Sequence, residues 1–443
     1  MKFQSTRGAP GVSLDDALLA GLAADGGLFV PDTLPRIDAG ALAGDDIRAT
    51  GRAVLAPFFD GSRLAGSLDE IVDETFSFPI PCVALRDDAQ APRLLELFHG
   101  PTAAFKDVGA GFLAACLSRL DDGASPLTIL VATSGDTGGA VAAAFDGRPG
   151  IRVAVLFPHG RVSARQEKQL TCWGENVLSL SVSGAFDDCQ ALVKAAFAER
   201  ALRERFRFSS ANSINIGRLL PQSIYYAHAA LEHERETGRK PSFVIPTGNL
   251  GNALACVLAR DMGLPVGDIV LSLNENRLIA DYLAGGEWAP RPSLHTHASA
   301  MDVGNPSNME RLRALHGDAD ELREQVSACV VTDEEIKAEI RRSHREFGRA
   351  LCPHTATAVH AWRQLPAARR AGSDWILVAT AHAAKFESVV EPLIGAAVPL
   401  PPELERILSR PSRAVRIEAD LDELARALAA AWPVDGRGGR GLE

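Results

Sequence analysis

The stretch LTILVATSGDTGGAVAAAF, residues 127–145, decides the fold class of this chain. It begins with a short apolar run of the length of a buried strand and ends in AVAAAF, a run of small residues suited to a helix. Between them lies the turn Ser134-Gly135-Asp136-Thr137-Gly138-Gly139, which is rich in glycine and hydroxyl groups. Strand, glycine-rich turn and helix in this order are typical of an α/β protein with a parallel sheet.

The same alternation recurs from about residue 93 onward. Further apolar runs are RLLELF, IRVAVLF, NVLSLSV, PSFVIPT, DIVLSL and DWILVAT, and helix-like stretches such as FDDCQALVKAAFAERAL separate them. Near-continuous apolar runs suit strands that are buried on both faces. We therefore predict a twisted, largely parallel sheet, with ligands bound in the loops at the carboxyl ends of its strands.

The two ends of the chain differ from this central part. Residues 1–90 have helical periodicity, as in SLDDALLAGLAADGG with Ser13 as helix N-cap, and prolines at 79 and 81 mark the approach to a boundary. They predict a separate N-terminal domain. The final GRGGRGLE predicts a disordered tail.

Composition limits the partners of the protein. The chain has 443 residues, of which 46% are hydrophobic and 23% charged, as in a soluble globular enzyme. Its net charge of −10 argues against nucleic acid or an anionic membrane as a partner, so the contacts to any anionic substrate must come from local cations. No apolar run approaches the roughly 20 residues of a membrane span. Because the N-terminus also lacks the apolar stretch of a secretory signal, we expect a cytoplasmic protein.

A second strand–turn–helix junction repeats the opening motif. The run SFVIPT is followed by Gly248-Asn249-Leu250-Gly251-Asn252 and then by the helix-like ALACVLAR. Such glycines let backbone N–H groups point at an anion, and a helix N-terminus adds its dipole. Either loop alone could be a simple tight connection, but two of them with clustered hydroxyls favour anion binding. Neither matches the G-x-G-x-x-G pattern of dinucleotide sites or the Gly-Lys-Ser/Thr ending of triphosphate loops.

Lys106 is the third candidate, in the segment FHGPTAAFKD that follows RLLEL. Only seven of the 46 lysine and arginine residues are lysines, and arginine cannot supply the neutral amine that condenses with a carbonyl. A helix N-terminus disfavours a cation and so lowers the pKa of an amine. The alternative is a lysine that reaches out to solvent or pairs with Asp107.

Five motifs occur together in order: FHGPTAAFKD, TSGDTGGA, SANSIN, PTGNLGN and TAHAAKF. With the opening GVSLDDALLAGLAADGGLFVP they resemble the longer members of the threonine synthase family, enzymes of fold type II that use pyridoxal phosphate. The resemblance runs from about residue 5 to beyond residue 390. It implies a tryptophan-synthase-β-like fold with two twisted, mostly parallel sheets flanked by helices, and a mainly helical N-terminal domain. The implied parts are the N-terminal domain (1–90), a smaller domain with the cofactor lysine (91–219), a larger cofactor domain (220–400) and a helical extension with the tail (401–443).

The resemblance also implies residue roles. Lys106 would hold the cofactor as a Schiff base and move protons. The cofactor phosphate would lie in the loop Gly248, Asn249, Leu250, Gly251 and Asn252, with Thr247 beside it, and Thr380 would face the pyridine nitrogen. The substrate carboxylate and the ring oxygen of the cofactor would be held by Ser134, Gly135, Asp136 and Thr137. The substrate phosphate would be held by Asn212, Ser213 and Arg218.

Two departures from the family pattern concern these motifs. Ala384 stands where the last motif usually has proline, which predicts a less rigid turn and puts the role of His382 in doubt. Leu250 and Asn252 stand where other members often have Phe and Asp. We expect both exchanges to be tolerated, because the loop acts through its backbone.

The reaction that the resemblance implies is the conversion of O-phospho-L-homoserine and water to L-threonine and phosphate, by a monomer or homodimer.

The nearest alternative function is that of a sister enzyme, such as a threonine dehydratase or cysteine synthase, which has no need for Arg218. An inactive homologue that acts as a binding module and a dinucleotide-dependent oxidoreductase are further alternatives. His295 and His297 alternate as metal ligands do, but a third ligand is not evident. Asp302 and Asn305 predict a loop that either lines the cleft or is capped internally.

Overall fold

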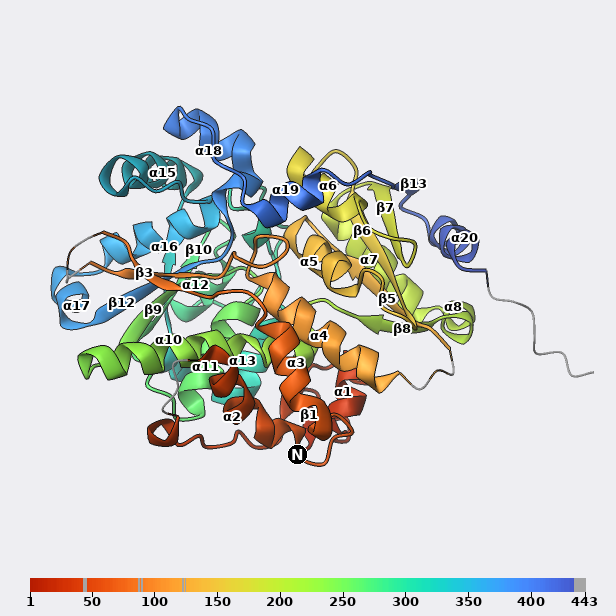
Figure 1. Ribbon diagram of the computed structural model, residues 1–443, viewed down its shortest axis with the longest axis horizontal. Helices are drawn as coiled ribbons and strands as arrows, with labels where there is room; N and C mark the ends of the chain where they lie inside the picture. Colours follow the sequence, from red (N-terminus) through yellow and green to blue (C-terminus); the bar gives the residue numbers. More distant parts are fainter. Residues whose placement is uncertain (43–45, 87, 89–90, 122, 124, 434–443) are drawn as a thin grey trace, which may run out of the picture.

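The computed structural model describes residues 1–433 except 43–45, 87, 89–90, 122 and 124. Two sheets lie side by side, each flanked by helices, with the N-terminal helices below them in the view of Figure 1. The predicted fold class is therefore confirmed. The tail GRGGRGLE, which we predict to be disordered, lies outside the described residues.

The larger sheet has six strands. Their order is β11 (Ser327–Val330), β10 (Ile269–Leu273), β9 (Pro241–Pro246), β12 (Asp374–Ala379), β4 (Arg93–Glu96) and β3 (Cys82–Ala84). All pairs are parallel except β3 with β4. In Figure 1 the sheet lies between α16 (Pro353–Gln364) on one side and α10 (Gln222–Thr237) and α11 (Gly251–Asp261) on the other.

The smaller sheet has five strands, all parallel. Their order is β13 (Val415–Glu418), β7 (Val177–Ser183), β6 (Ile151–Pro158), β5 (Leu127–Ala132) and β8 (Arg207–Ser210). Alternate residues of β5 enter different cores: Ile129 and Val131 belong to the core that includes α4 (Lys106–Leu120) and α5 (Asp136–Phe145). Leu130 belongs to the core beneath α7 (Phe186–Ala198) and α20 (Leu421–Ala431). Burial on both faces explains why the run LTILVA is apolar throughout.

The N-terminal part combines helices with one small sheet. It contains α1 (Leu14–Ala20), α2 (Ile47–Phe59), α3 (Leu68–Thr75), the antiparallel strands β1 (Phe3–Ser5) and β2 (Phe29–Pro31), and 3-10 turns η1 (Ala39–Ala41) and η2 (Ala65–Ser67). Ser13 caps α1 as predicted, because its side chain accepts a hydrogen bond from the N–H of Asp16.

The remaining helices and 3-10 turns surround the two larger sheets. They are α6 (Ala164–Thr171), α8 (Arg200–Arg205), α9 (Ile216–Leu219), α12 (Leu278–Leu283), η3 (Ser299–Met301), α13 (Asn308–His316), α14 (Ala319–Gln325), α15 (Asp333–Phe347), α17 (Ala367–Gly372), η4 (Ala383–Phe386), α18 (Glu387–Ile394) and α19 (Pro402–Leu408).

The division of the chain into four parts stays a prediction. Two strand pairings join residues from different predicted parts. β3 and β4 lie on either side of residue 90 yet pair in the larger sheet. β13, which follows residue 401, pairs with β7 of the smaller sheet.

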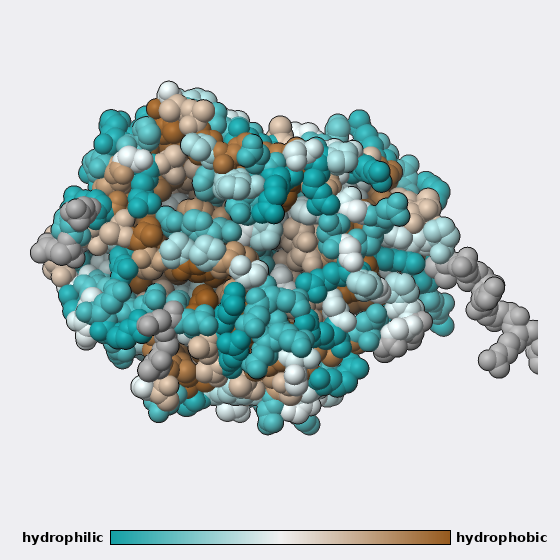
Figure 2. Space-filling model, in the orientation of Figure 1, coloured by the Kyte–Doolittle hydropathy of each residue, from teal (hydrophilic) through white to brown (hydrophobic). Residues whose placement is uncertain are grey.

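The surface is mainly hydrophilic. On the face shown in Figure 2, apolar side chains gather only in small, separated patches. Among the large hydrophobic residues that the structure describes, only Leu22, Leu294 and Val415 are exposed. No helix in the described part of the chain combines the length and hydropathy that crossing a membrane requires.

Candidate active site

A cavity of about 1420 Å³ opens where strands of both sheets end. It is bordered by residues that follow β5, β9 and β12 at their carboxyl ends, as the α/β rule predicts. The cavity wall includes the predicted residues Lys106, Ser134, Asp136, Thr137, Asn212, Ser213, Arg218, Thr247, Gly248, Asn249, Leu250, Gly251, Asn252 and Thr380. Gly135 is not part of the wall; it is the N-cap of α5 with φ 141°, and its N–H donates to Thr133 Oγ1.

Lys106 is brought to this cavity by a pairing between two distant segments. The N–H of Phe105 donates to the carbonyl of Thr380 at 2.8 Å, and the N–H of His382 donates to the carbonyl of Ala103 at 3.0 Å. These bonds join the turn before α4 to the segment that follows β12. Lys106 and Thr380 therefore reach the same cavity, although 273 positions separate them in the sequence.

The same segment resolves the role of His382. Its ring Nδ1 accepts a hydrogen bond from the N–H of Ala384 at 3.2 Å and so caps the turn η4. A proline at 384 would have no N–H to donate, so this bond depends on the alanine at this position. His382 packs edge-on against Phe98 and is not part of the cavity wall, which makes it a turn cap.

Lys106 begins α4, and its amine lies 3.9 Å from Asp136 Oδ2. Burial lowers the pKa of Lys106 to about 8; Asp136 opposes this change, and the nearby charges of Lys385 and Arg218 add to it. Asp107 is not the partner of Lys106, because its carboxylate accepts from the N–H and the hydroxyl of Thr102. A buried amine with a lowered pKa is suited to react with a carbonyl group.

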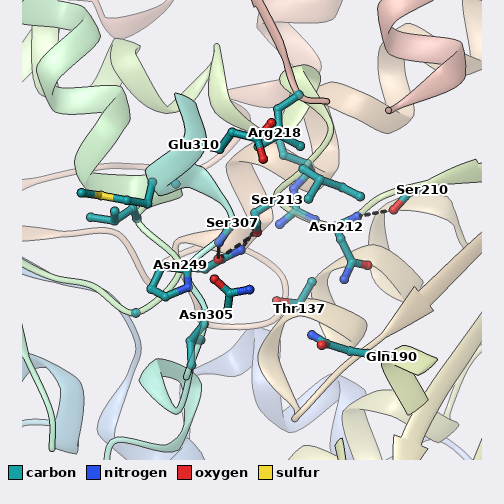
Figure 3. A pocket seen from close by; sticks show the side chains of 18 of the residues that line it. Thr137, Gln190, Ser210, Asn212, Ser213, Arg218, Asn249, Asn305, Ser307 and Glu310 are labelled. Atoms are coloured by element: carbon teal, nitrogen blue, oxygen red, sulfur yellow. Dashed lines mark hydrogen bonds between the residues drawn. The ribbon is translucent and has the colours of Figure 1, made fainter. Parts of the chain in front are cut away.

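The loop of residues 248–252 offers a row of free backbone donors. Leu250 has φ 62°, which turns the chain at the start of α11. Among the residues that the structure describes, none accepts a hydrogen bond from the five N–H groups of this loop. The side chain of Asn249 is engaged, donating to Ser213 Oγ and accepting from the N–H and hydroxyl of Ser307 (Figure 3). Free amides at a helix N-terminus form a site for a phosphate group.

Gly248 carries a prediction about this loop. A Cβ at this position would lie 2.7 Å from the Cα of Met301, a backbone atom that cannot turn aside. We expect Gly248→Ala to displace the loop and weaken binding of a phosphate-bearing cofactor about 10-fold, a cost within the ~1–3 kcal/mol of overpacked sites. Titration of the cofactor-free protein measures it. Gly111→Ala in α4 is the matched control, because its Cβ would meet no atom within 4 Å; equal effects would contradict the prediction.

Arg218 is a buried cation in the cavity wall. It is 3% exposed, and within the described part of the chain no carboxylate forms an ion pair with it. One guanidinium N–H group donates to the carbonyl of Ala211, while Nε has no partner. Burial lowers the pKa of Arg218 to about 10, which leaves it charged at neutral pH. A buried cation without a counter-ion beside a cavity favours an anionic ligand.

Several residues of the site were not predicted from the sequence. His354 and Gln190 line the cavity, and Figure 3 shows Gln190 across from Asn249, near Thr137. Burial lowers the pKa of His354 to about 4. Lys385 lies 2.9 Å from Asp136 and is fully buried; its only signal in the sequence is its place in the motif TAHAAKF.

The loop with Asp302 and Asn305 has both of its predicted properties. Both residues line the cavity. Asp302 also holds the loop together, accepting from Asn274 Nδ2 and from the N–H and hydroxyl of Thr296. Burial raises the pKa of Asp302 to about 6.

The two histidines of LHTHAS lie near different carboxylates. His295 approaches Asp302 at 3.4 Å, and His297 approaches Asp333 at 3.9 Å. Across the described residues, no group of three or more His, Cys, Asp or Glu side chains is arranged to hold a metal ion.

The fold and this cavity define an enzyme that depends on pyridoxal phosphate. The family of pyridoxal-phosphate dependent enzymes matches residues 81–381, which include both glycine-rich loops and Lys106. Residues 2–76 match the threonine synthase N terminus, and residues 355–428 match the C-terminal region of threonine synthase. The chain belongs to the threonine synthase family.

Individual relatives agree with this membership. The threonine synthases of Serratia marcescens and Escherichia coli are each 37% identical to the chain, and each comparison covers 94% of this chain and 96% of the relative. Among solved structures, threonine synthase of Brucella melitensis with bound pyridoxal phosphate superposes with a TM-score of 0.90 at 36% identity. That comparison covers 98% of this chain and all of the Brucella chain.

Proposed function

We propose that this protein converts O-phospho-L-homoserine and water to L-threonine and inorganic phosphate. The observation that carries the proposal is the buried Arg218, which has no carboxylate partner among the described residues and lies in the same cavity wall as Lys106. In this proposal the loop 248–252 would hold the cofactor phosphate. A second, separate cation is what a substrate with its own phosphate requires, in a protein whose net charge is −10.

The residues of the cavity fit pyridoxal phosphate. The five free N–H groups of residues 248–252 would hold its phosphate, and the amine of Lys106 would bind its carbonyl carbon. The hydroxyl of Thr380 would face its ring nitrogen without forcing that nitrogen to be protonated. When bound, the cofactor supplies a conjugated ring that delocalises negative charge from the substrate.

The substrate residues divide into two groups. Ser134, Asp136 and Thr137 lie on the loop after β5, where free amides and hydroxyls would hold the substrate carboxylate. Asn212, Ser213 and Arg218 lie on the segment after β8 and would hold the phosphate. Figure 3 shows Asn212 and Ser213 on the side of the cavity next to Arg218.

The reaction needs several proton transfers around one substrate. Protons leave Cα and Cβ, the phosphate leaves Cγ, Cγ gains a proton, and water adds at Cβ before Cα is protonated again. We assign these transfers to the amine of Lys106, because one mobile base with a pKa of about 8 can both accept and return protons near neutral pH.

A product assay tests the proposal. The cofactor-loaded protein is expected to release threonine and phosphate in equal amounts from O-phospho-L-homoserine, and to form little keto acid from L-serine or L-threonine. Brisk deamination of threonine without turnover of the phosphorylated substrate would instead identify a sister enzyme. A protein that binds the cofactor and turns over none of these substrates would be an inactive homologue.

Two further properties belong to this proposal. We propose a cytoplasmic location for the protein. We also propose that it acts as a monomer or a homodimer. Light scattering during size-exclusion chromatography measures its molar mass directly.

A further inference from the structure

Lys385 connects two loops of the site that are far apart in the sequence. Its side chain is fully buried. Its amine lies 2.9 Å from Asp136 Oδ1 and donates to the carbonyl of Thr102 at 2.7 Å. Thr102 belongs to the turn that leads into Lys106, and Asp136 begins α5. A single amine therefore fastens the segment that carries Lys106 to the loop that carries Asp136.

Asp136 is shared between two lysines at unequal distances. Oδ1 receives Lys385 at 2.9 Å and the side-chain amide of Gln166 at 3.3 Å, whereas Oδ2 is 3.9 Å from the amine of Lys106. Although burial opposes it, the charges of Lys385 and Lys106 hold the pKa of Asp136 well below its usual range. The carboxylate thus forms its close ion pair with Lys385 and only a longer contact with Lys106.

We propose that Lys385 is a positioning residue for Lys106: it holds the Asp136 carboxylate beside the Lys106 amine and keeps that carboxylate from closing a direct ion pair with it. The inference rests on the proposed function of Lys106 as cofactor-binding amine and base. An amine locked in a close ion pair stays protonated, and a protonated amine can neither attack a carbonyl nor accept a proton. Lys385 therefore favours the neutral form of Lys106.

Several charged or titratable groups face Lys106. They are Asp136 on α5, Lys385 on η4, Arg218 on α9, His354 on α16 and Asp107 on α4 itself. Burial is the main cause of the lowered pKa of Lys106, and Lys385 and Arg218 lower it further while the two carboxylates raise it. Removal of Lys385 would abolish one repulsion and free Asp136 to approach Lys106. Both changes raise the pKa of Lys106.

The test measures the protonation of Lys106 directly. Full-length protein freed of cofactor is labelled with trace acetic anhydride over a range of pH, and mass spectrometry of the Lys106 peptide gives the midpoint pH of labelling. In Lys385→Met the midpoint is expected to rise by about 1, so that labelling at pH 7 slows about 10-fold. Lys385→Arg keeps a cation at this position and should restore part of the difference. Lys168→Met is the matched control, because this partly buried lysine donates to the carbonyl of Arg410 and does not line the cavity.

The midpoint separates positioning from a purely structural role. A structural role would lower the folded fraction, seen by thermal unfolding, and leave the midpoint of the folded molecules unchanged; that result overturns the proposal. If Lys385→Met does not fold, Lys385→Gln, which keeps a hydrogen-bond donor at this position without the charge, is measured instead, and an unchanged midpoint overturns the proposal as well. Since labelling needs neither cofactor nor substrate, failure of the threonine assay is a separate outcome.

Discussion

Borohydride treatment of the cofactor-loaded protein is expected to leave a pyridoxyl group on Lys106 and on none of the other six lysines. Lys106 combines a lowered pKa of about 8 with a position in the wall of the cavity that also holds the free amides of residues 248–252. Reduction fixes the carbon–nitrogen bond between the amine and the cofactor, and peptide mass spectrometry locates it. A modification on another lysine, or a protein that stays colourless with cofactor, would contradict the assignment.

Replacement of the same residue gives the largest expected loss of activity. Lys106→Ala removes both the attachment point and the base, and we expect turnover to fall by about 10³-fold or more, within the range of a lost general base and nucleophile. The variant should still bind the cofactor weakly, because the loop amides remain. Lys240→Ala, at an exposed lysine remote from the cavity, is the control and should keep full activity.

The sequence predicted the interior of both sheets and none of their edges. The seven apolar runs became β4, β5, β6, β7, β9, β10 and β12, which all lie between two neighbouring strands. The four strands of these two sheets that were missed, β3, β8, β11 and β13, are their outer strands, and β1 and β2 of the small N-terminal sheet were missed as well. An outer strand pairs on one side only, is often short, and carries polar residues, as RFSS and VRIE do here. The apolar pattern in the sequence is therefore weakest at the outer strands, whose position in the sheet is decided by tertiary contacts.

The same reasoning explains which site residues the sequence predicted. Residues directly after interior strands, such as Ser134 and Gly248, were found because the strands locate them, whereas Thr380 was found only through the family resemblance. Lys385 and His354 reach the site from the turn η4 and the helix α16, and they belong to it only through their positions near Asp136, more than 200 positions away in the sequence. Periodicity carries no information about such contacts.

We expect Arg218 to separate threonine synthesis from the reactions of sister enzymes. Its guanidinium is buried, lines the cavity and has no carboxylate partner among the described residues, so a substrate phosphate would complete its charge balance. A hydrogen bond to a charged group contributes about 1.5–3 kcal/mol. We therefore expect Arg218→Ala to reduce kcat/KM for O-phospho-L-homoserine at least ~10-fold, with the visible absorption of the cofactor unchanged.

The control for the Arg218→Ala experiment is a substrate that lacks the phosphate group. Any slow side reaction of the wild type on unphosphorylated serine or threonine should be far less affected by Arg218→Ala, because these substrates do not reach the phosphate site. Arg218→Lys should restore only part of the loss, since a point charge cannot replace a two-pronged guanidinium. If both kinds of substrate lose activity equally, Arg218 acts on the fold or on the carboxylate. Loss of its bond to the carbonyl of Ala211 and of the packing of its Nε beside Gly109 would then be the cause, and the thermal unfolding midpoint would fall together with activity.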